Sequence, residues 1–330
     1  MKFISLGEIM LRLKAPAHER LLQSPIFEST FGGSEANVAV SLANFGLDSA
    51  FVTALPQNDI GDIALAELKR FGVDVSHVVR SGQRVGIYYL ETGSNQRPSR
   101  VVYDRGGSSI AEADQDLFDW PAIFSTARWL HISGITPALS PTAAELSLEA
   151  CRQAKSQGLT ISCDFNHRRQ LWQYGKAAPE VMTGLVELVD VGIGNLSNCS
   201  RSLGIEAENH EALAGKLSQQ FPNLSTLAFT VRESQSADRS TLSACLWSAG
   251  DFILGPRYEL NDVVDRVGGG DAFAAGLIYG LTHLDDKSHA LAFATAAGCL
   301  KHTIPGDFNR VGVDEVEAVV GGETSGGIRR

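Results

Sequence analysis

The chain has little of what would direct it to nucleic acid, a membrane or an oxidising compartment. It carries 28 lysines and arginines against 38 aspartates and glutamates, a formal net charge of −10. This deficit of positive charge argues against nucleic acid or an anionic membrane as the main partner. It has no apolar run of the roughly 20 residues that span a bilayer, and no signal-peptide pattern at its N-terminus. Its five cysteines are scattered without a C-x-x-C pair, as expected of free thiols in a reducing compartment. These absences predict a soluble cytoplasmic protein.

What is present indicates a large α/β fold. The chain has 330 residues, 44% of them hydrophobic, which is enough for a substantial core. From about residue 109 onward, buried strands alternate with amphipathic helices, a rhythm typical of a parallel sheet covered on both faces. Strands are expected at 129–133, 159–163, 189–193 and 225–231, with antiparallel β structure at 242–254 before a final pair of helices.

A second, smaller sheet is predicted outside this core. Residues 85–90 and 100–103 are β-like and are separated by a polar turn, which predicts a hairpin. Together with the segment that follows residue 9, this hairpin is expected to form a β lid. The predicted division is therefore a core of 1–9, 33–82 and 109–330 and a lid of 10–32 and 83–108. The exposed edge of the lid sheet predicts a homodimer that pairs through the lid.

The most informative stretch is 265–271, in which three glycines directly precede Asp271 and a small-residue apolar run follows. A helix that begins here would present free backbone N–H groups and the positive end of its dipole to an anion. Asp271 would stand at the mouth of that helix, where it could accept a proton from an attacking hydroxyl. The simpler alternative is a tight turn with an acidic cap. The stretch is neither a Walker loop nor G-x-G-x-x-G, so it does not predict a dinucleotide site.

Polar residues follow the predicted parallel strands. Asp164 and Asn166 follow the strand at 159–163, Asn195 follows the next, and Arg232 follows the one after. In open α/β sheets the ligand binds beyond the carboxyl ends of the strands. These residues and Asp271 are therefore predicted to line one cleft.

Two ordered motifs resemble the signatures of the PfkB, or ribokinase-like, carbohydrate kinases. Residues 32–39 (GGSEANVA) are similar to the family's N-terminal glycine-pair signature, and residues 265–271 (DRVGGGD) to its C-terminal signature. Within the family the chain is most similar to 2-keto-3-deoxygluconate kinases, through the stretches at 88–91, 102–105, 133–140, 164–168 and 301–307. The resemblance implies a ribokinase-like three-layer α/β sandwich with a mainly parallel central sheet and a small β lid.

The resemblance also implies site residues for the sugar. Asp271 would deprotonate a primary hydroxyl of the sugar, and the amides of Gly268, Gly269 and Gly270 would stabilise the transferring phosphoryl group. The residues implied to bind the sugar are Gly33, Asn37, Tyr89, Tyr103, Arg105 and Arg168. The two arginines favour a sugar acid, because a guanidinium pairs with a carboxylate through two parallel hydrogen bonds.

For the nucleotide, the resemblance implies ATP with Mg²⁺, bound beside Asn195, Thr230, Arg232 and Thr295. Asp265 would help to hold a monovalent cation such as K⁺ behind the glycines. Three positions depart from the family pattern: Asn198 replaces a glutamate, the loop at 230–234 lacks a glycine, and Thr295 replaces an asparagine.

The sequence therefore predicts an ATP-dependent kinase that phosphorylates the terminal hydroxyl of 2-keto-3-deoxygluconate. Two alternatives stay open at this point. One is a kinase for a neutral ketohexose such as fructose, or for another sugar acid. The other is a sugar-binding protein that has lost catalysis.

Overall fold

The computed structural model describes residues 1–323 and is built on an eight-stranded sheet. The strand order is β14-β13-β12-β11-β10-β9-β1-β4; the pairs from β4 to β12 are parallel, and β13 and β14 are antiparallel. The bounds are β1 (Lys2–Leu6), β4 (Asp48–Val52), β9 (Ala127–Ser133), β10 (Thr160–Asp164), β11 (Val191–Gly194), β12 (Thr226–Ser234), β13 (Ser240–Ser248) and β14 (Asp251–Leu260). The mainly parallel sheet predicted from the alternating pattern is confirmed.

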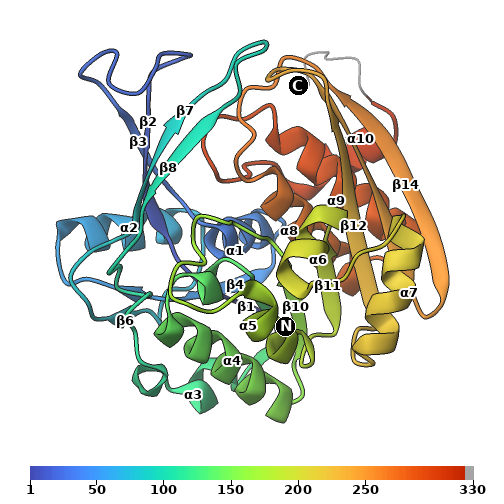
Figure 1. Cartoon of the computed structure of the whole chain (residues 1–330), viewed down its shortest axis with the longest axis horizontal. Coiled ribbons are helices and arrows are strands. Elements are labelled where there is room, and N and C mark those ends of the chain that lie inside the picture. Colours follow the sequence, from blue (N-terminus) through green and yellow to red (C-terminus); the bar gives the residue numbers. More distant parts are fainter. Residues whose placement is uncertain (324–330) are drawn as a thin grey trace.

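Helices cover both faces of this sheet and complete a three-layer sandwich (Figure 1). One layer holds α1 (Ser34–Asn44), α8 (Gly269–His283), α9 (Lys287–Lys301) and α10 (Val313–Val320). The other holds α3 (Trp120–Phe124), α4 (Pro141–Ser156), α5 (Ala178–Val186), α6 (Leu196–Leu203) and α7 (His210–Gln220). Beside the β4 edge lie α2 (Asp59–Arg70) and the short pair β5 (Ala54–Leu55) and β6 (Val79–Arg80).

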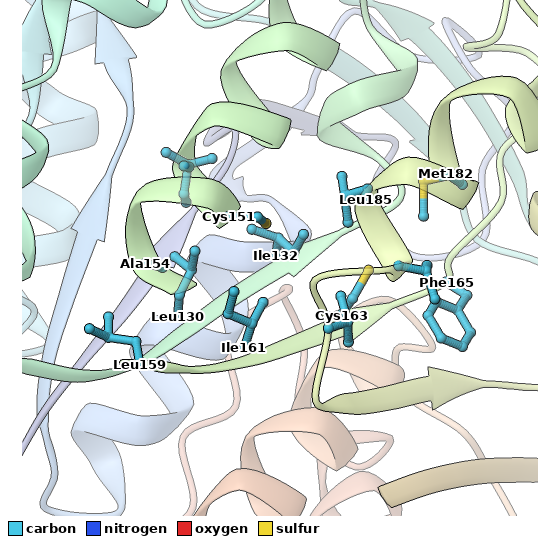
Figure 2. Packing of buried hydrophobic residues seen from close by; sticks show 14 of the residues in the cluster. Leu130, Ile132, Cys151, Ala154, Leu159, Ile161, Cys163, Phe165, Met182 and Leu185 are labelled. Atoms are coloured by element: carbon cyan, nitrogen blue, oxygen red, sulfur yellow. The ribbon is translucent and has the colours of Figure 1, made fainter. Parts of the chain in front are cut away.

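The core forms where the apolar runs of the central strands meet these helices. Figure 2 shows side chains of β9 and β10 packed against α4 and α5. Leu130, Ile132, Ile161 and Cys163 come from the strands, and Cys151, Ala154, Met182 and Leu185 from the helices. Each fully buried aliphatic side chain of this kind contributes about 1.5–3 kcal/mol to stability. This rigid layer fixes the strand ends from which the site is built.

The second sheet has four strands in the order β3-β2-β7-β8 and projects beyond the sandwich (Figure 1). Its strands are β2 (Met10–Lys14), β3 (Glu28–Gly32), β7 (Ile87–Glu91) and β8 (Arg100–Asp104). All four come from the two segments predicted as the lid. The β7–β8 pair is the predicted antiparallel hairpin, and β2 joins the segments by pairing parallel to β7.

The cysteines are free thiols and most are buried. Cys151, Cys163, Cys199 and Cys245 are buried, and Cys299 is partly buried. Burial raises the pKa of the Cys151 thiol to about 12, so this group is protonated and unreactive at neutral pH. In residues 1–323, no helix has the length and apolar character that crossing a membrane requires.

Candidate active site

A cleft of about 770 Å³ lies between the lid sheet and the carboxyl ends of the parallel strands. The lid contributes Met10, Tyr88, Leu90 and Tyr103 to its walls. The residues expected to gather at the strand ends all line this one cleft: Asp164, Asn166, Asn195, Arg232 and Asp271. Its volume is within the range of small-molecule sites.

The floor of the cleft is the N-terminus of α8. Gly268 caps this helix with φ of 86°, and a Cβ at that position would come within 2.0 Å of the Asp307 carbonyl oxygen. Only glycine satisfies both constraints. Among the described residues, the amides of Gly270 and Asp271 have no hydrogen-bond acceptor, while that of Gly269 faces the Arg266 carbonyl at 3.4 Å. The helix therefore presents free N–H groups and its positive dipole end to the cleft.

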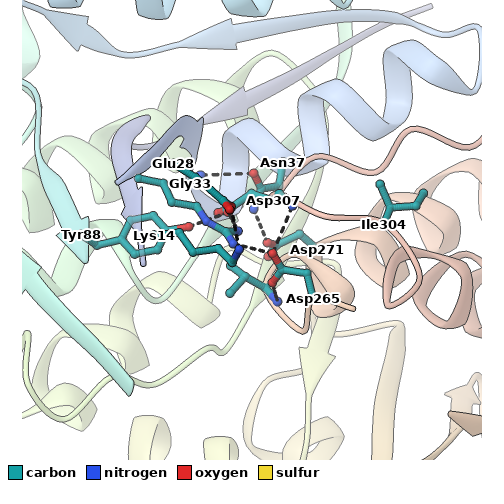
Figure 3. A network of polar contacts seen from close by, with 12 residues as sticks. Lys14, Glu28, Gly33, Asn37, Tyr88, Asp265, Asp271, Ile304 and Asp307 are labelled. Atoms are coloured by element: carbon teal, nitrogen blue, oxygen red, sulfur yellow. Dashed lines mark hydrogen bonds and ion pairs between the residues drawn. The ribbon is translucent and has the colours of Figure 1, made fainter. Parts of the chain in front are cut away.

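Asp271 stands in the first turn of α8, and both of its carboxylate oxygens accept hydrogen bonds from α1. Ser34 Oγ donates to Oδ1 at 2.8 Å, and Asn37 Nδ2 donates to Oδ2 at 2.7 Å. The side chain lines the cleft although the residue is 8% exposed. Burial raises the pKa of Asp271, and the hydrogen bonds from Asn37 and Ser34 oppose that rise. The arrangement, in part visible in Figure 3, gives an oriented carboxylate beside free amides.

Two side chains at the start of α1, Ser34 and Asn37, hold Asp271. Gly33 caps the helix, and the Ser34 hydroxyl donates to Asp271. Asn37, predicted to bind the sugar, lines the cleft; its Nδ2 donates to Asp271, and its Oδ1 accepts the Gly33 amide at 3.2 Å. Gly33 lines the cleft, and a Cβ there would lie 1.9 Å from the Glu8 carbonyl oxygen. The close approach of these segments therefore requires glycine at residue 33.

Two lid tyrosines line the cleft, and only one of them was predicted. Tyr103 lines the cleft as expected, but Tyr89 does not, and its ring packs edge-on against Phe27 with centroids 5.9 Å apart. Tyr88 faces the cleft and donates to Asp307 Oδ1 at 2.5 Å. Side chains alternate along a strand, so a one-residue misassignment moves the hydroxyl to the opposite face. The alternation of side chains along β7 could have identified Tyr88, because Tyr88 and the apolar Leu90 lie on the same, buried face of the strand.

The two predicted arginines occupy different environments in the same cleft. Arg105 is 5% exposed, and its Nε donates to Glu8 Oε2 at 2.5 Å. Arg168 is exposed, and within residues 1–323 its guanidinium donates only to the carbonyl of His167, at 3.2 Å. Both line the cleft, so their charges face the same space as Asp271. The buried arginine is fixed by a carboxylate, and the exposed one is available to an anionic ligand.

Three of the four predicted nucleotide residues line the cleft. Asn195 caps α6 by accepting the Asn198 amide at 2.8 Å, and Thr230 donates to the Gly194 carbonyl at 3.5 Å. Arg232 lies within β12, which runs to Ser234 because it pairs with β13 over its whole length. Thr295 was assigned wrongly. It is fully buried in α9, its hydroxyl donates to the Leu291 carbonyl at 2.7 Å, and it does not line the cleft.

Asp265 is engaged by a guanidinium from the lid. Its Oδ2 accepts Arg12 Nη2 at 2.5 Å and the Gly306 amide at 3.1 Å, and its Oδ1 accepts the Val267 amide at 3.1 Å. Arg12 is 1% exposed, and its Nη1 also donates to Asp307 Oδ1 at 2.6 Å. Sequence reasoning missed Arg12 and gave no role to Asp307, because a buried pair 295 residues apart leaves no local pattern. Figure 3 shows Asp265, Asp271 and Asp307 in one network.

A buried carboxyl group beneath the cleft makes stability depend on pH. Glu35 accepts from Ser133 Oγ at 2.7 Å and Thr136 Oγ1 at 2.9 Å, and burial raises its pKa to about 7. Because this pKa is higher in the folded than in the unfolded chain, the folded state binds more protons between about pH 4.5 and 7. The contribution of Glu35 to stability is therefore complete at low pH and is lost as pH rises towards 7.

This linkage predicts the behaviour of Glu35→Gln, which keeps an acceptor for both hydroxyls but carries no charge. Relative to wild type, its Tm should rise by about 3–6 °C at pH 8 and differ little at pH 5. Thermal denaturation of both proteins across this range checks the prediction, with the surface variant Glu187→Gln as control. A Tm difference that is constant with pH would contradict it.

Known proteins match this chain along nearly its whole length. The profile described as "pfkB family carbohydrate kinase" matches residues 2–309. The chain is 31% identical to the 2-dehydro-3-deoxygalactonokinase of Haloferax volcanii, over 98% of both proteins. It is 28% identical to the 2-dehydro-3-deoxygluconokinase of Bacillus subtilis, over 93% of this chain and 91% of that protein. The crystal structure of 2-dehydro-3-deoxygluconokinase from Thermotoga maritima superposes with a TM-score of 0.93 and 45% identity, covering 97% of this chain and 98% of that one.

Proposed function

The chain belongs to the PfkB family of carbohydrate kinases, and from this premise we propose that it phosphorylates the terminal hydroxyl of 2-keto-3-deoxygluconate. The products are 2-keto-3-deoxy-6-phosphogluconate and ADP. The observation that carries the proposal is the pairing of Asp271, oriented by Ser34 and Asn37, with the free amides of α8. The relatives named above support the substrate class, since their names denote 2-keto-3-deoxy acids that differ in configuration at C4.

Each part of the transfer is assigned to residues of the cleft. The terminal hydroxyl gives its proton to Asp271 as its oxygen attacks the γ-phosphorus of ATP. A new P–O bond forms to the sugar, and the bond from the γ-phosphorus to the ADP oxygen breaks. The amides of Gly270 and Asp271 and the dipole of α8 stabilise the charge on the phosphoryl oxygens. The raised pKa of Asp271 makes it a stronger base than an exposed carboxylate.

We assign ATP to the ends of β11 and β12, because Asn195, Thr230 and Arg232 line the cleft there. Mg²⁺, when bound, neutralises charge on the phosphates. Mg²⁺ prefers carboxylate oxygens as ligands. Four carboxylates of the described residues line the cleft: Asp271 is bonded to α1, Asp265 and Asp307 are bonded to Arg12, and Asp164 is bonded to neither. Burial and the neighbouring charge of Asp271 raise the pKa of Asp164 to about 7, so a nearby cation would favour its ionised form. Asn198 lines the same region with a neutral amide, so Asp164 supplies the charge that Asn198 lacks.

The carboxylate of the sugar acid is assigned to Arg168, with Arg105 as the fixed second positive charge. Arg168→Ala should raise KM for the sugar acid about 10–100-fold, the loss expected for a charge-assisted hydrogen-bonded pair. The KM for a neutral sugar should change less than about threefold. Arg169→Ala is the matched control, because Arg169 is the adjacent exposed arginine and does not line the cleft. An unchanged KM for the acid in Arg168→Ala would remove its assignment to the carboxylate.

A panel of single substrates with Mg-ATP in a coupled ADP-release assay tests the proposed function. The proposal expects the highest kcat/KM for 2-keto-3-deoxygluconate or its C4 epimer, and a value at least about tenfold lower for fructose. A fructose value above both keto-acids would favour the neutral-sugar alternative. Saturable binding without ADP formation for every sugar would favour the non-catalytic alternative.

The lid is proposed to close the cleft and to carry the dimer contact. Residues 10–32 and 83–108 form this unit, and its tip is bonded to the core, where the Ala237 amide donates to the Asn95 carbonyl at 2.8 Å. The lid also exposes large apolar side chains, with Leu22 75% and Ile26 60% exposed. A homodimer that pairs through the lid would cover such surface. Light scattering on the purified protein tests this assignment, since a monomer at all concentrations would refute it.

The reduced state of the cysteines supports a cytoplasmic setting. Five thiols without a disulfide partner are stable in a reducing compartment and would pair or oxidise outside it.

A further inference from the structure

Lys301, the last residue of α9, is fully buried behind the glycine turn of the cleft. Its Nζ donates to the Ile304 carbonyl at 3.1 Å. Its Cε lies next to the turn, since a Cβ added to Gly268 would be 3.1 Å from it. A buried ammonium group is costly unless charge and hydrogen bonds compensate for its lost hydration. The side chain is not part of the phosphoryl-transfer machinery described above, and it contributes nothing to the cleft surface.

The compensation comes from two carboxylates, Asp265 and Asp307. Arg12 bonds to both, and Lys301 is the second buried cation in their field. The cluster thus brings two positive and two negative side chains together, and each of the four residues is no more than 6% exposed. Burial lowers the pKa of Lys301, and the charges of Asp265, Asp307 and Asp271 oppose that change. The surrounding carboxylates therefore favour the ammonium form.

The same residues take up oxygens that the monovalent cation implied by the family resemblance would need. K⁺ needs several free oxygen ligands, but a carboxylate and a backbone carbonyl behind the glycine turn already accept hydrogen bonds. Asp265 is occupied by Arg12 and by the amides of Val267 and Gly306. The Ile304 carbonyl is taken by Lys301 itself.

We propose that the Lys301 ammonium is the built-in cation of this site and makes phosphoryl transfer independent of monovalent metal ions. It ties the end of α9 to Ile304 and so fixes the loop that carries Asp307. The Asp307 carbonyl in turn abuts Gly268, whose left-handed turn aims the free amides of α8 at the transferring group. Lys301 is a positioning residue that acts through this loop, and its charge adds positive potential behind the phosphoryl group. The inference rests on the proposed kinase function.

The first test compares wild-type turnover in K⁺, Na⁺ and tetramethylammonium chlorides at equal ionic strength, with ATP supplied as its Tris salt. The expected result is that kcat differs by less than about twofold among the three salts. A rate more than about fivefold higher in K⁺ than in tetramethylammonium would overturn the proposal. The comparison uses whichever sugar is turned over fastest. The test therefore remains valid if the preferred substrate is not the sugar acid, and its result bears only on the role of Lys301.

The second test removes the amine and asks whether a small free cation replaces it. Lys301→Met should lower kcat by about 10²-fold with little change in the KM for the sugar, the loss typical of one oriented electrostatic contact in a site. In Lys301→Ala, 100 mM NH₄⁺ or K⁺ should restore activity at least about tenfold, whereas tetramethylammonium should not. Lys287→Ala is the control, since this lysine is on the same helix and donates to Ser248 Oγ at 2.8 Å, far from the cleft in the fold.

Two results of the second test would overturn the proposal. One is a Lys301→Met variant that keeps more than half of the wild-type kcat. The other is a Lys301→Ala variant that folds, loses turnover and is not restored by any small cation, because the amine would then be structural only. A readout besides activity comes from thermal denaturation, in which NH₄⁺ should raise the Tm of Lys301→Ala but not that of wild type. If neither variant folds, the salt comparison on wild type decides the matter alone.

Discussion

Replacing Asp271 by asparagine is expected to lower kcat by about 10³–10⁴-fold while the protein folds normally. Asparagine still accepts from Ser34 but cannot take a proton from the attacking hydroxyl, which is the largest contribution assigned to a single side chain here. Its amide faces the amide nitrogen of Asn37, where the carboxylate had accepted a hydrogen bond, so a small loss of local order is expected. Steady-state kinetics with Mg-ATP and the preferred sugar, together with circular dichroism, provide the measurement.

Ser34→Ala is the matched control for Asp271→Asn. It removes one of the two hydrogen bonds that orient the carboxylate and leaves the base in place, so a loss of only about tenfold is expected. Turnover by Asp271→Asn within tenfold of wild type would reject Asp271 as the base. A Ser34→Ala variant as impaired as Asp271→Asn would mean that orientation, and not proton transfer, limits the reaction.

Gly268→Ala is expected to lower kcat by about 10²–10³-fold and to reduce stability as well. The new methyl group would lie 2.0 Å from the Asp307 carbonyl oxygen, on a residue whose φ is 86°. The turn or the facing loop must move, and the free amides of α8 would no longer point at the phosphoryl oxygens. The KM for the sugar should change far less than kcat, because the sugar is held by other residues. Kinetics and a melting curve on one preparation measure both effects.

Gly46→Ala is the control that separates the effect of backbone strain from the effect of displacing the free amides of α8. Gly46 also has a positive φ, 81°, but a Cβ there has nothing within 4 Å. This variant should lose about 1 kcal/mol of stability with unchanged kcat. If Gly268→Ala shows only the same modest destabilisation and full turnover, the amides of α8 are not part of the transfer.

Much of the fold could be predicted because local patterns and long-range packing agree. The strands β9 and β10 are short, mostly apolar and largely buried, and the amphipathic helix α4 separates them, which is the pattern of buried parallel strands. The lid hairpin was predictable from the polar turn between two β-like stretches. Helix α6 was missed. Its residues, LSNCSRSL, have weak helix propensity, and its stability comes from the Asn195 cap and from burial of Cys199 and Leu203.

The site was predictable where backbone geometry dictated residue type, and less so where partners are distant in sequence. The glycines before Asp271 indicated a helix N-terminus from local pattern alone. That Ser34 bonds to Asp271 was not visible, because the pair is separated by 237 residues. Thr295 was predicted to lie at the nucleotide, but the packing of α9 against α8 turns it into the core. Tyr89 was predicted to line the cleft, but the alternation of side chains along β7 turns it to the opposite face, against Phe27. The side chains of Arg12 and Lys301 come together behind the glycine turn only when the lid and α9 have folded against each other.

The central claim is that the cleft transfers phosphate to the terminal oxygen of a 2-keto-3-deoxy acid. It is tested most directly by one competition experiment, in which equal amounts of 2-keto-3-deoxygluconate, its C4 epimer and fructose share a limiting quantity of Mg-ATP. Phosphorus NMR of the mixture then reports which sugar was phosphorylated and at which carbon. The account predicts that nearly all phosphate is found on the terminal CH₂–O of the keto-acids. A spectrum dominated by fructose phosphate, or by inorganic phosphate without any sugar ester, would contradict it.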